Sequence, residues 1–139
     1  MFEKHTVPFI YLGSDDYNRE AVEKYNITTY EGGYLGGTIV GGAGDLSIGI
    51  FYPRSIDIRN KIILEKIVNI LQKYNINALI DNNDILVNNK KVLGAATLET
   101  ANYYGFVAYI GFNDNADLVI EICGEHDKKP GFLEGITAE

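Results

Sequence analysis

The densest glycine cluster in the chain lies at positions 32–44, where seven of thirteen residues are glycine. A short β-branched run, Thr38-Ile39-Val40, interrupts the glycines, and an apolar run from Leu46 to Tyr52 follows them. Glycine adopts backbone angles that other residues avoid, and it lets another group approach the backbone closely. The pattern therefore predicts a glycine-rich hairpin whose backbone another group approaches closely.

Composition narrows the class of protein. A chain of 139 residues that is 46% apolar and 22% charged fits one domain with a sizeable core, and it excludes a disordered or low-complexity protein. The sequence lacks the roughly 18 consecutive apolar residues of a membrane helix and the apolar core of a signal peptide. One cysteine, Cys123, permits no internal disulfide. A net charge of −7 repels phosphate backbones. We expect a soluble cytoplasmic protein that binds neither membranes nor nucleic acid.

Strand and helix patterns alternate before the glycine cluster. The apolar run Val7 to Tyr11 predicts a strand, which Pro8 places at a sheet edge or at the strand's beginning. Ser14-Asp15-Asp16 predicts the N-cap of a helix over residues 17–25, and Asn26 is a candidate C-cap. The β-branched residues that follow predict a strand over 27–30.

The clearest helix pattern comes after the cluster. Asp57 is the expected cap, Asn75 the expected end, and apolar residues recur between them at the 3.6-residue period: Ile63, Ile67, Ile70, Leu71 and Tyr74. A strand is expected over 76–80. The segments 84–87 and 90–93 predict a hairpin around Asn88-Asn89, since asparagine tolerates positive φ.

The last third of the chain predicts one long strand and one ambiguous segment. The aromatic-rich run 102–112 predicts the strand. Asn113-Asp114-Asn115 can cap a helix over 116–123 that Gly124 closes, but Val119, Ile120 and Ile122 fit a strand equally well. Together the patterns predict an α+β fold with a mainly antiparallel sheet and two or three helices.

A glycine-rich hairpin beside a lysine on a second hairpin is one candidate site for chemistry. Glycine backbones bring N–H groups close to an anion, and lysine adds a point charge. Such glycines serve turns and bulges more often than they bind a phosphate. Residues 32–36 match neither the phosphate-binding nor the dinucleotide-binding glycine motif.

Three segments follow one another along residues 8–112: PFIYLGSDDYNREAVEKYNITTYE, GGYLGGTIVGGAGDLSIGIFYPRS and NNDILVNNKKVLGAAT. Their order resembles the catalytic domain of the lipoate–protein ligase family, within the biotin/lipoate ligase superfamily. Lys91-Val92-Leu93-Gly94 keeps the family's lysine segment complete, and Asn83-Asp84 keeps the strand expected to pair with it.

The resemblance implies a two-step reaction. Lipoate attacks the α-phosphate of MgATP to give lipoyl-adenylate, and the acyl group then moves to a lysine of an acceptor lipoyl domain. Some relatives instead take an octanoyl or lipoyl group from a carrier thioester. A small acyl ligand, ATP with Mg²⁺ and an acceptor domain are the implied partners, with no tightly bound cofactor and no structural metal.

The resemblance also implies site residues. Lys91 is the expected catalytic residue, because its charge would stabilise the carboxylate and α-phosphate. Gly36 and Gly37 would let the backbone approach the phosphate and the acyl chain, and the strand Thr38-Ile39-Val40 would wall an apolar tunnel. The other candidate binding residues share the matching motifs: Asp45, Asn83, Asp84, Gly94 and Ala95.

The sequence departs from the family pattern at several positions. Glu31-Gly32 replaces an arginine pair, Leu35 replaces the first of three glycines, and Gly41-Gly42 replaces a His-Asp step. Asp45 replaces an asparagine, and Tyr104-Gly105 stands where a His-Gly pair is usual. We expect a single domain over 1–139 without the family's first helix and C-terminal accessory domain. A separate accessory subunit could supply the missing parts.

Three functions fit these observations. The chain is a lipoyl or octanoyl transferase or ligase, a non-catalytic domain that binds an acyl ligand or a protein, or a relative with another substrate class. A tunnel filled by Leu35 would argue against acyl binding. Cys123 is expected to be a small buried apolar residue, and His5 and His126 are expected to be solvated.

Overall fold

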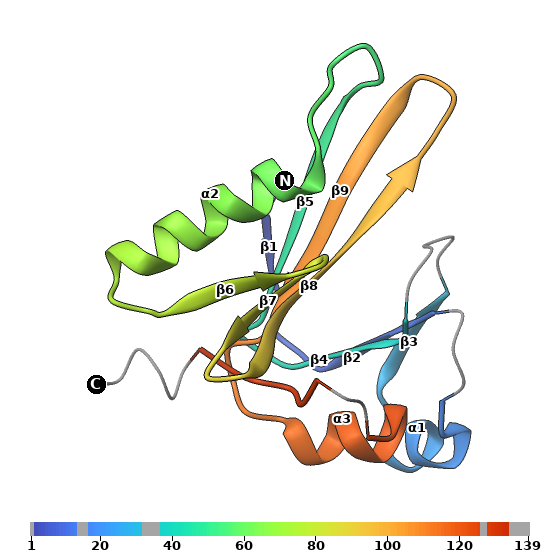
Figure 1. Ribbon diagram of the computed structural model, residues 1–139. Coiled ribbons are helices and arrows are strands. Elements are labelled where there is room, and N and C mark those ends of the chain that lie inside the picture. The colour runs from blue at the N-terminus through green and yellow to red at the C-terminus, as the bar shows by residue number, and fades with distance from the viewer. Residues whose placement is uncertain (1, 14–16, 32–36, 126–127, 134–139) are drawn as a thin grey trace.

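The computed structural model describes residues 2–13, 17–31, 37–125 and 128–133. Two β-sheets and three helices make up this part of the chain (Figure 1). The larger sheet is antiparallel throughout and has the order β1 (Phe2–Lys4), β5 (Leu46–Pro53), β9 (Tyr103–Ile110), β8 (Lys90–Glu99), β7 (Asp84–Val87), β6 (Ala78–Asp81). The smaller sheet has the order β3 (Thr28–Glu31), β2 (Phe9–Leu12), β4 (Ile39–Gly41). The predicted α+β class is confirmed.

Helix α2 (Asn60–Lys73) covers one face of the larger sheet (Figure 1). Its apolar stripe buries Ile63, Leu64 and Val68 against the sheet, where Phe106 and Leu93 are almost fully buried. The expected cap at Asp57 is wrong. Arg59 occupies the N-cap position without a side-chain hydrogen bond, because the helix begins two residues later than the Asp57 cap requires.

Helices α1 (Arg19–Tyr25) and α3 (Ala116–Cys123) cover one face of the smaller sheet (Figure 1). Ala21 of α1 and Ile122 of α3 are buried there against Ile10 and Val40. Segment 116–123 is therefore a helix and not a strand, because its apolar residues pack on a sheet face and pair with no neighbouring strand.

The caps of α1 differ in part from the sequence prediction. Asn18 caps its N-terminus by accepting from the Ala21 amide at 3.2 Å, whereas the expected caps at 14–16 lie outside the described residues. Asn26 ends the helix in the left-handed conformation with a φ of 47°, as predicted. The Asn88-Asn89 turn also has positive φ at both residues, which confirms the predicted hairpin of β7 and β8.

The predicted glycine-rich hairpin is wrong. Strand β4 pairs with β2 in the smaller sheet, whereas β5 pairs with β1 and β9 in the larger one. Residues 42–45 carry the chain from one sheet to the other through a turn in which the Asp45 amide donates to the Gly42 carbonyl at 3.2 Å. Both sheets therefore meet at this turn, and their faces without helices lie opposite each other. None of the helices in the described ranges is long and apolar enough to cross a membrane.

Candidate functional site

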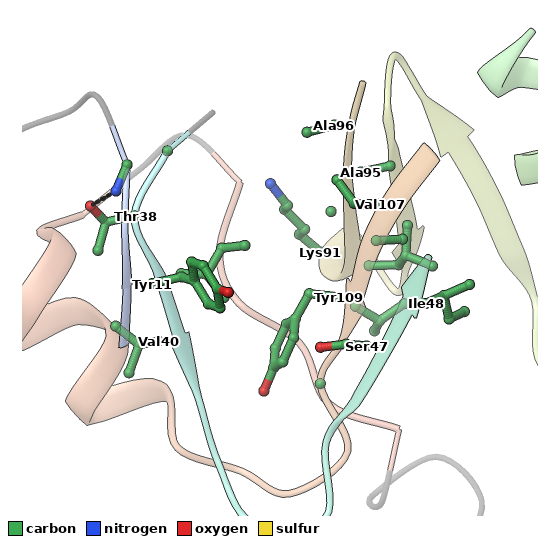
Figure 2. A pocket seen from close by; sticks show the side chains of 18 of the residues that line it. Tyr11, Thr38, Val40, Ser47, Ile48, Lys91, Ala95, Ala96, Val107 and Tyr109 are labelled. Carbon is green, nitrogen blue, oxygen red and sulfur yellow. Dashed lines mark hydrogen bonds between the residues drawn. The ribbon is translucent and has the colours of Figure 1, made fainter. Parts of the chain in front are cut away.

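A cavity of about 680 Å³ lies between the two sheets, on the faces that no helix covers. Figure 2 shows Tyr11 and Thr38 of one wall opposite Ala96 and Val107 of the other, with Lys91 projecting between them. Pockets of this size hold small organic ligands. The cavity is therefore the candidate functional site.

The wall from the larger sheet is built mostly from small residues. Side chains alternate between the faces of a strand, and the strand register aligns two rows across β5, β9 and β8 on this face. The rows are Gly49–Val107–Ala96 and Ser47–Tyr109–Gly94. Because glycine and alanine flank Val107, this row leaves space on both sides of the Val107 side chain.

The wall from the smaller sheet is aromatic and β-branched. Phe9 and Tyr11 of β2 and Ile39 of β4 line the cavity, while Ile10 faces the helices. Phe9 stands edge-on to Tyr109 of the opposite wall, with the ring centroids 5.7 Å apart, so these two rings close one end of the cavity. A Cβ at Gly41 would collide with both rings, which explains the glycine there.

His5 also lies at this closed end, which corrects the expectation that it is solvated. Its ring packs on Phe9 at a centroid distance of 4.0 Å, and its Nε2 is 2.7 Å from the Ser47 hydroxyl. No sequence motif indicates this pair, because residues 5 and 47 come together only through the pairing of β1 with β5.

Lys91 brings a positive charge to the edge of the apolar cavity. Its Nζ is 3.0 Å from Oδ1 of Asp84, and its side chain is 41% exposed. The other oxygen of Asp84 contacts Nζ of Lys128 at 2.8 Å, and Lys128 also contacts Asp81 at 3.1 Å. The hydrogen bonds that Lys128 donates to Asp84 and Asp81 raise its pKa above the usual value, so it is protonated at neutral pH.

A β-bulge directs Lys91 into the cavity. Lys91 and Leu93 would share one face in a regular strand. The pairing with β7 shifts between Ile85 and Leu86, so that Val92 is an extra residue on β8. Leu93 consequently packs in the core beneath α2, whereas the Lys91 side chain projects into the cavity (Figure 2). The neighbouring Lys90 is exposed and does not line it.

Gly94 leaves room for the lysine side chain. A Cβ at Gly94 would lie 2.8 Å from Cε and 3.1 Å from Nζ of Lys91. We predict that Gly94→Ala displaces the ammonium group and weakens any function that needs it, with a stability change within about 1 kcal/mol, because only the end of a flexible side chain must move. Ligand titration and thermal unfolding of the same variant test this. In a Lys91→Ala background the substitution should have no further effect on ligand affinity, and an equal effect there would contradict the prediction.

Asp45 holds the cavity's closed end together from behind. It is fully buried, and its carboxylate accepts hydrogen bonds from the backbone amides of Gly42, Phe112 and Asn113 at 2.8, 2.6 and 3.3 Å and from the hydroxyl of Tyr109. Burial and this contact raise the pKa of Tyr109, so its hydroxyl stays protonated and donates. The carboxylate joins the turn after β4 to the loop after β9.

The structure brings together most of the residues singled out from the sequence. Six of them line the cavity: Gly37, Thr38, Ile39, Lys91, Gly94 and Ala95. Asp84 lies behind Lys91, and Asn83 accepts from the Ala95 amide at 3.0 Å; neither lines the cavity, and nor does Asp45. Gly36 and Leu35 lie outside the described residues. Among the described residues, no three metal-ligating side chains cluster.

The chain matches known proteins in structure but not in sequence. No family model matches the chain, and no curated protein matches its sequence. Solved structures do match. Lipoate-protein ligase A bound with ATP superposes with a TM-score of 0.84 at 18% identity, covering 99% of this chain and 64% of the ligase. LipL1 of P. falciparum in complex with lipoate gives 0.81 at 17% identity, covering 96% of this chain and 40% of LipL1.

An archaeal relative is similar as well. The bi-partite lipoate protein ligase of Thermoplasma acidophilum, solved in a study of the ligase and its E2 lipoyl domain, gives a TM-score of 0.77 at 20% identity, covering 99% of this chain and 57% of that one. The chain therefore has the fold of a lipoate–protein ligase catalytic domain, as the sequence resemblance predicted. It spans less than two thirds of the length of each of these structures.

Proposed function

We propose that this chain is a lipoate–protein ligase-like domain that binds a lipoyl or octanoyl group in the cavity between its sheets. The carboxyl end of the acid lies at Lys91, and the acyl group passes to a lysine of an acceptor domain. The observation that carries the proposal is the position of the Lys91 ammonium group at the edge of an apolar cavity.

The walls suit a hydrocarbon chain. Ile39, Val107 and Ala96 offer apolar surface, and Gly49 leaves space beside them. Burying the seven carbons beyond the carboxyl group of octanoate contributes about 5–6 kcal/mol at roughly 0.8 kcal/mol for each. Two similar structures support the same ligand class, since LipL1 was solved in complex with lipoate and Ta0514, a putative lipoate protein ligase of T. acidophilum, with bound lipoic acid.

The reaction follows from the ligand's chemistry. A carboxylate oxygen attacks the α-phosphorus of MgATP, pyrophosphate leaves, and an acyl-adenylate forms. The acceptor amine then attacks the acyl carbon, AMP leaves, and the amine loses a proton as the amide forms. Lys91 holds the carboxylate and offsets the negative charge that develops beside it. ATP is proposed as substrate because a similar ligase was solved with it.

A partner would complete the system. The Thermoplasma ligase is bi-partite and was studied with its E2 lipoyl domain, and this chain covers 57% of that ligase chain. We accordingly propose a lipoyl domain as the acceptor and a separate accessory subunit as a second partner.

Mass spectrometry tests the proposal. The protein is mixed with MgATP and, in turn, with lipoate, octanoate and biotin. The expected result is an acyl-adenylate and one pyrophosphate per adenylate with lipoate or octanoate. If no adenylate forms with any acid, the chain is not a ligase that acts by itself. Acyl transfer from a carrier thioester, and adenylate formation by the chain together with an accessory subunit, are then tested.

A cavity-filling substitution provides a second prediction. Ala96→Leu adds three carbons beside Val107, which would displace about three carbons of the ligand and weaken octanoate binding roughly fiftyfold, from about 0.8 kcal/mol per carbon. Calorimetric titration measures the affinity. Ala101→Leu is the matched control, since Ala101 is exposed in the turn after β8. Equal affinities for the two variants would place the ligand elsewhere.

A non-catalytic acyl-binding domain is the second candidate, and the charges of the cavity favour it. None of the chain's three arginines, Arg19, Arg54 and Arg59, lines the described part of the cavity. Lys91 and Lys128, which do line it, share the carboxylate of Asp84. Octanoate binding without any release of pyrophosphate would identify this function.

A further inference from the structure

The lysine pair around Asp84 is an unusual arrangement of charge. Each oxygen of one carboxylate contacts a different ammonium group, Lys91 at 3.0 Å and Lys128 at 2.8 Å. Asp84 itself is only 15% exposed. Both lysines line the same cavity, one from β8 and the other from the segment that follows α3.

This arrangement matters when an anionic ligand arrives. Lys91 can engage a carboxylate in the cavity only by loosening its contact with Asp84. If Lys91 were the sole partner, the exchange would leave a mostly buried carboxylate without a cation, which is costly. Lys128 keeps one oxygen of Asp84 paired during the exchange, so the departure of Lys91 costs less.

The segment that carries Lys128 is fixed beside Lys91 by backbone contacts. The Lys91 amide donates to the Lys129 carbonyl at 2.8 Å, and the Gly131 amide donates to the Lys91 carbonyl at 2.7 Å. A Cβ at Gly131 would lie 2.7 Å from Cβ of Lys90, so the segment lies very close to β8. Lys128 therefore stays in reach of Asp84 whichever partner Lys91 selects.

We propose that Lys128 is a positioning residue that holds Asp84 and so frees Lys91 to bind the anionic group of the ligand. Lys128 acts through Asp84 and does not contact the ligand. The inference rests on the proposed function, because it assigns the step by which Lys91 receives a carboxylate.

Calorimetric titration with octanoate and with uncharged octanamide tests the inference. Lys128→Ala is expected to weaken octanoate binding at least about tenfold and to leave octanamide binding unchanged. Adding Asp84→Asn to Lys128→Ala should restore the affinity of the Asp84→Asn single variant, because the charge that competes for Lys91 is gone. Lys128→Arg should bind octanoate as the unsubstituted chain does, and Lys129→Ala, which changes an exposed neighbour, is the control.

Two results would overturn the inference. Octanoate affinity unaffected by Lys128→Ala would remove any role for Lys128. A loss that persists in the Asp84→Asn background would show that Lys128 touches the ligand itself.

A ligand-free readout separates this inference from the proposed function. Acetic anhydride labels lysine amines, and mass spectrometry gives the rate at Lys91 relative to Lys90 in the same sample. Lys128→Ala should slow labelling of Lys91, and the added Asp84→Asn should restore it. If the unsubstituted chain binds neither octanoate nor octanamide, the proposed function fails. The labelling rates still show whether Lys128 acts on Lys91 through Asp84. Unchanged rates would contradict the inference.

Discussion

Replacing Lys91 by alanine is expected to lower acyl-adenylate formation at least about a hundredfold. Loss of one group that stabilises developing charge typically costs a hundredfold to a thousandfold in rate. Lys91 is the cation that the bulge on β8 directs into the cavity, and the other cation near it, Lys128, is held by both Asp84 and Asp81. The variant is assayed with MgATP and the acid that the unsubstituted protein activates.

Lys90→Ala is the matched control for this experiment. It removes the same charge one residue away, from a side chain that is exposed and outside the cavity. We expect this variant to retain its rate within about twofold. Equal losses in the two variants would mean that net charge, rather than the position of Lys91, governs the reaction.

Asp45→Ala is expected to destabilise the fold by roughly 3–5 kcal/mol, because it leaves several buried donors without an acceptor. The amides of Gly42 and Phe112 and the hydroxyl of Tyr109 all donate to this carboxylate. These donors come from the turn after β4, from β9 and from the loop after β9, so the loss should also open the closed end of the cavity. Urea unfolding followed by circular dichroism measures the free energy of unfolding.

Two further variants complete this test. Tyr109→Phe removes one of the donors and should cost less than Asp45→Ala. Asp57→Ala removes an exposed carboxylate and should change stability by no more than about 0.5 kcal/mol. An Asp45→Ala variant as stable as Asp57→Ala would show that the buried carboxylate does not hold the loops together.

Local patterns were sufficient to predict most elements of the fold. The Asn88-Asn89 turn, the left-handed Asn26 and the apolar period of α2 each depend on neighbours within a few residues. The lysine segment on β8 was recognisable for the same reason, since Lys91 to Gly94 is continuous in sequence. These local patterns were enough to predict the fold class and to single out Lys91, the central residue of the candidate site.

Contacts between distant segments could not be predicted in this way. The glycine cluster indicated a hairpin in which β4 pairs with β5. Whether the two strands pair or separate depends on Asp45 and on the loop after β9, whose amides donate to that carboxylate. Lys128 gave no signal, because its role depends on the pairing of the segment after α3 with β8. His5 was expected to be solvated, since nothing near it in sequence indicates the packing against Phe9.

The most direct test of the account is to map where an acyl chain binds. A medium-chain fatty acid with a diazirine near its methyl end is photolysed with the protein, and mass spectrometry identifies the labelled residues. An acyl chain bound between the sheets should label Ile39, Ala96 and Val107, and excess octanoate should suppress this labelling. Labelling of the exposed face of α2, for example at Ile70, or labelling that octanoate does not suppress, would contradict an acyl site between the sheets.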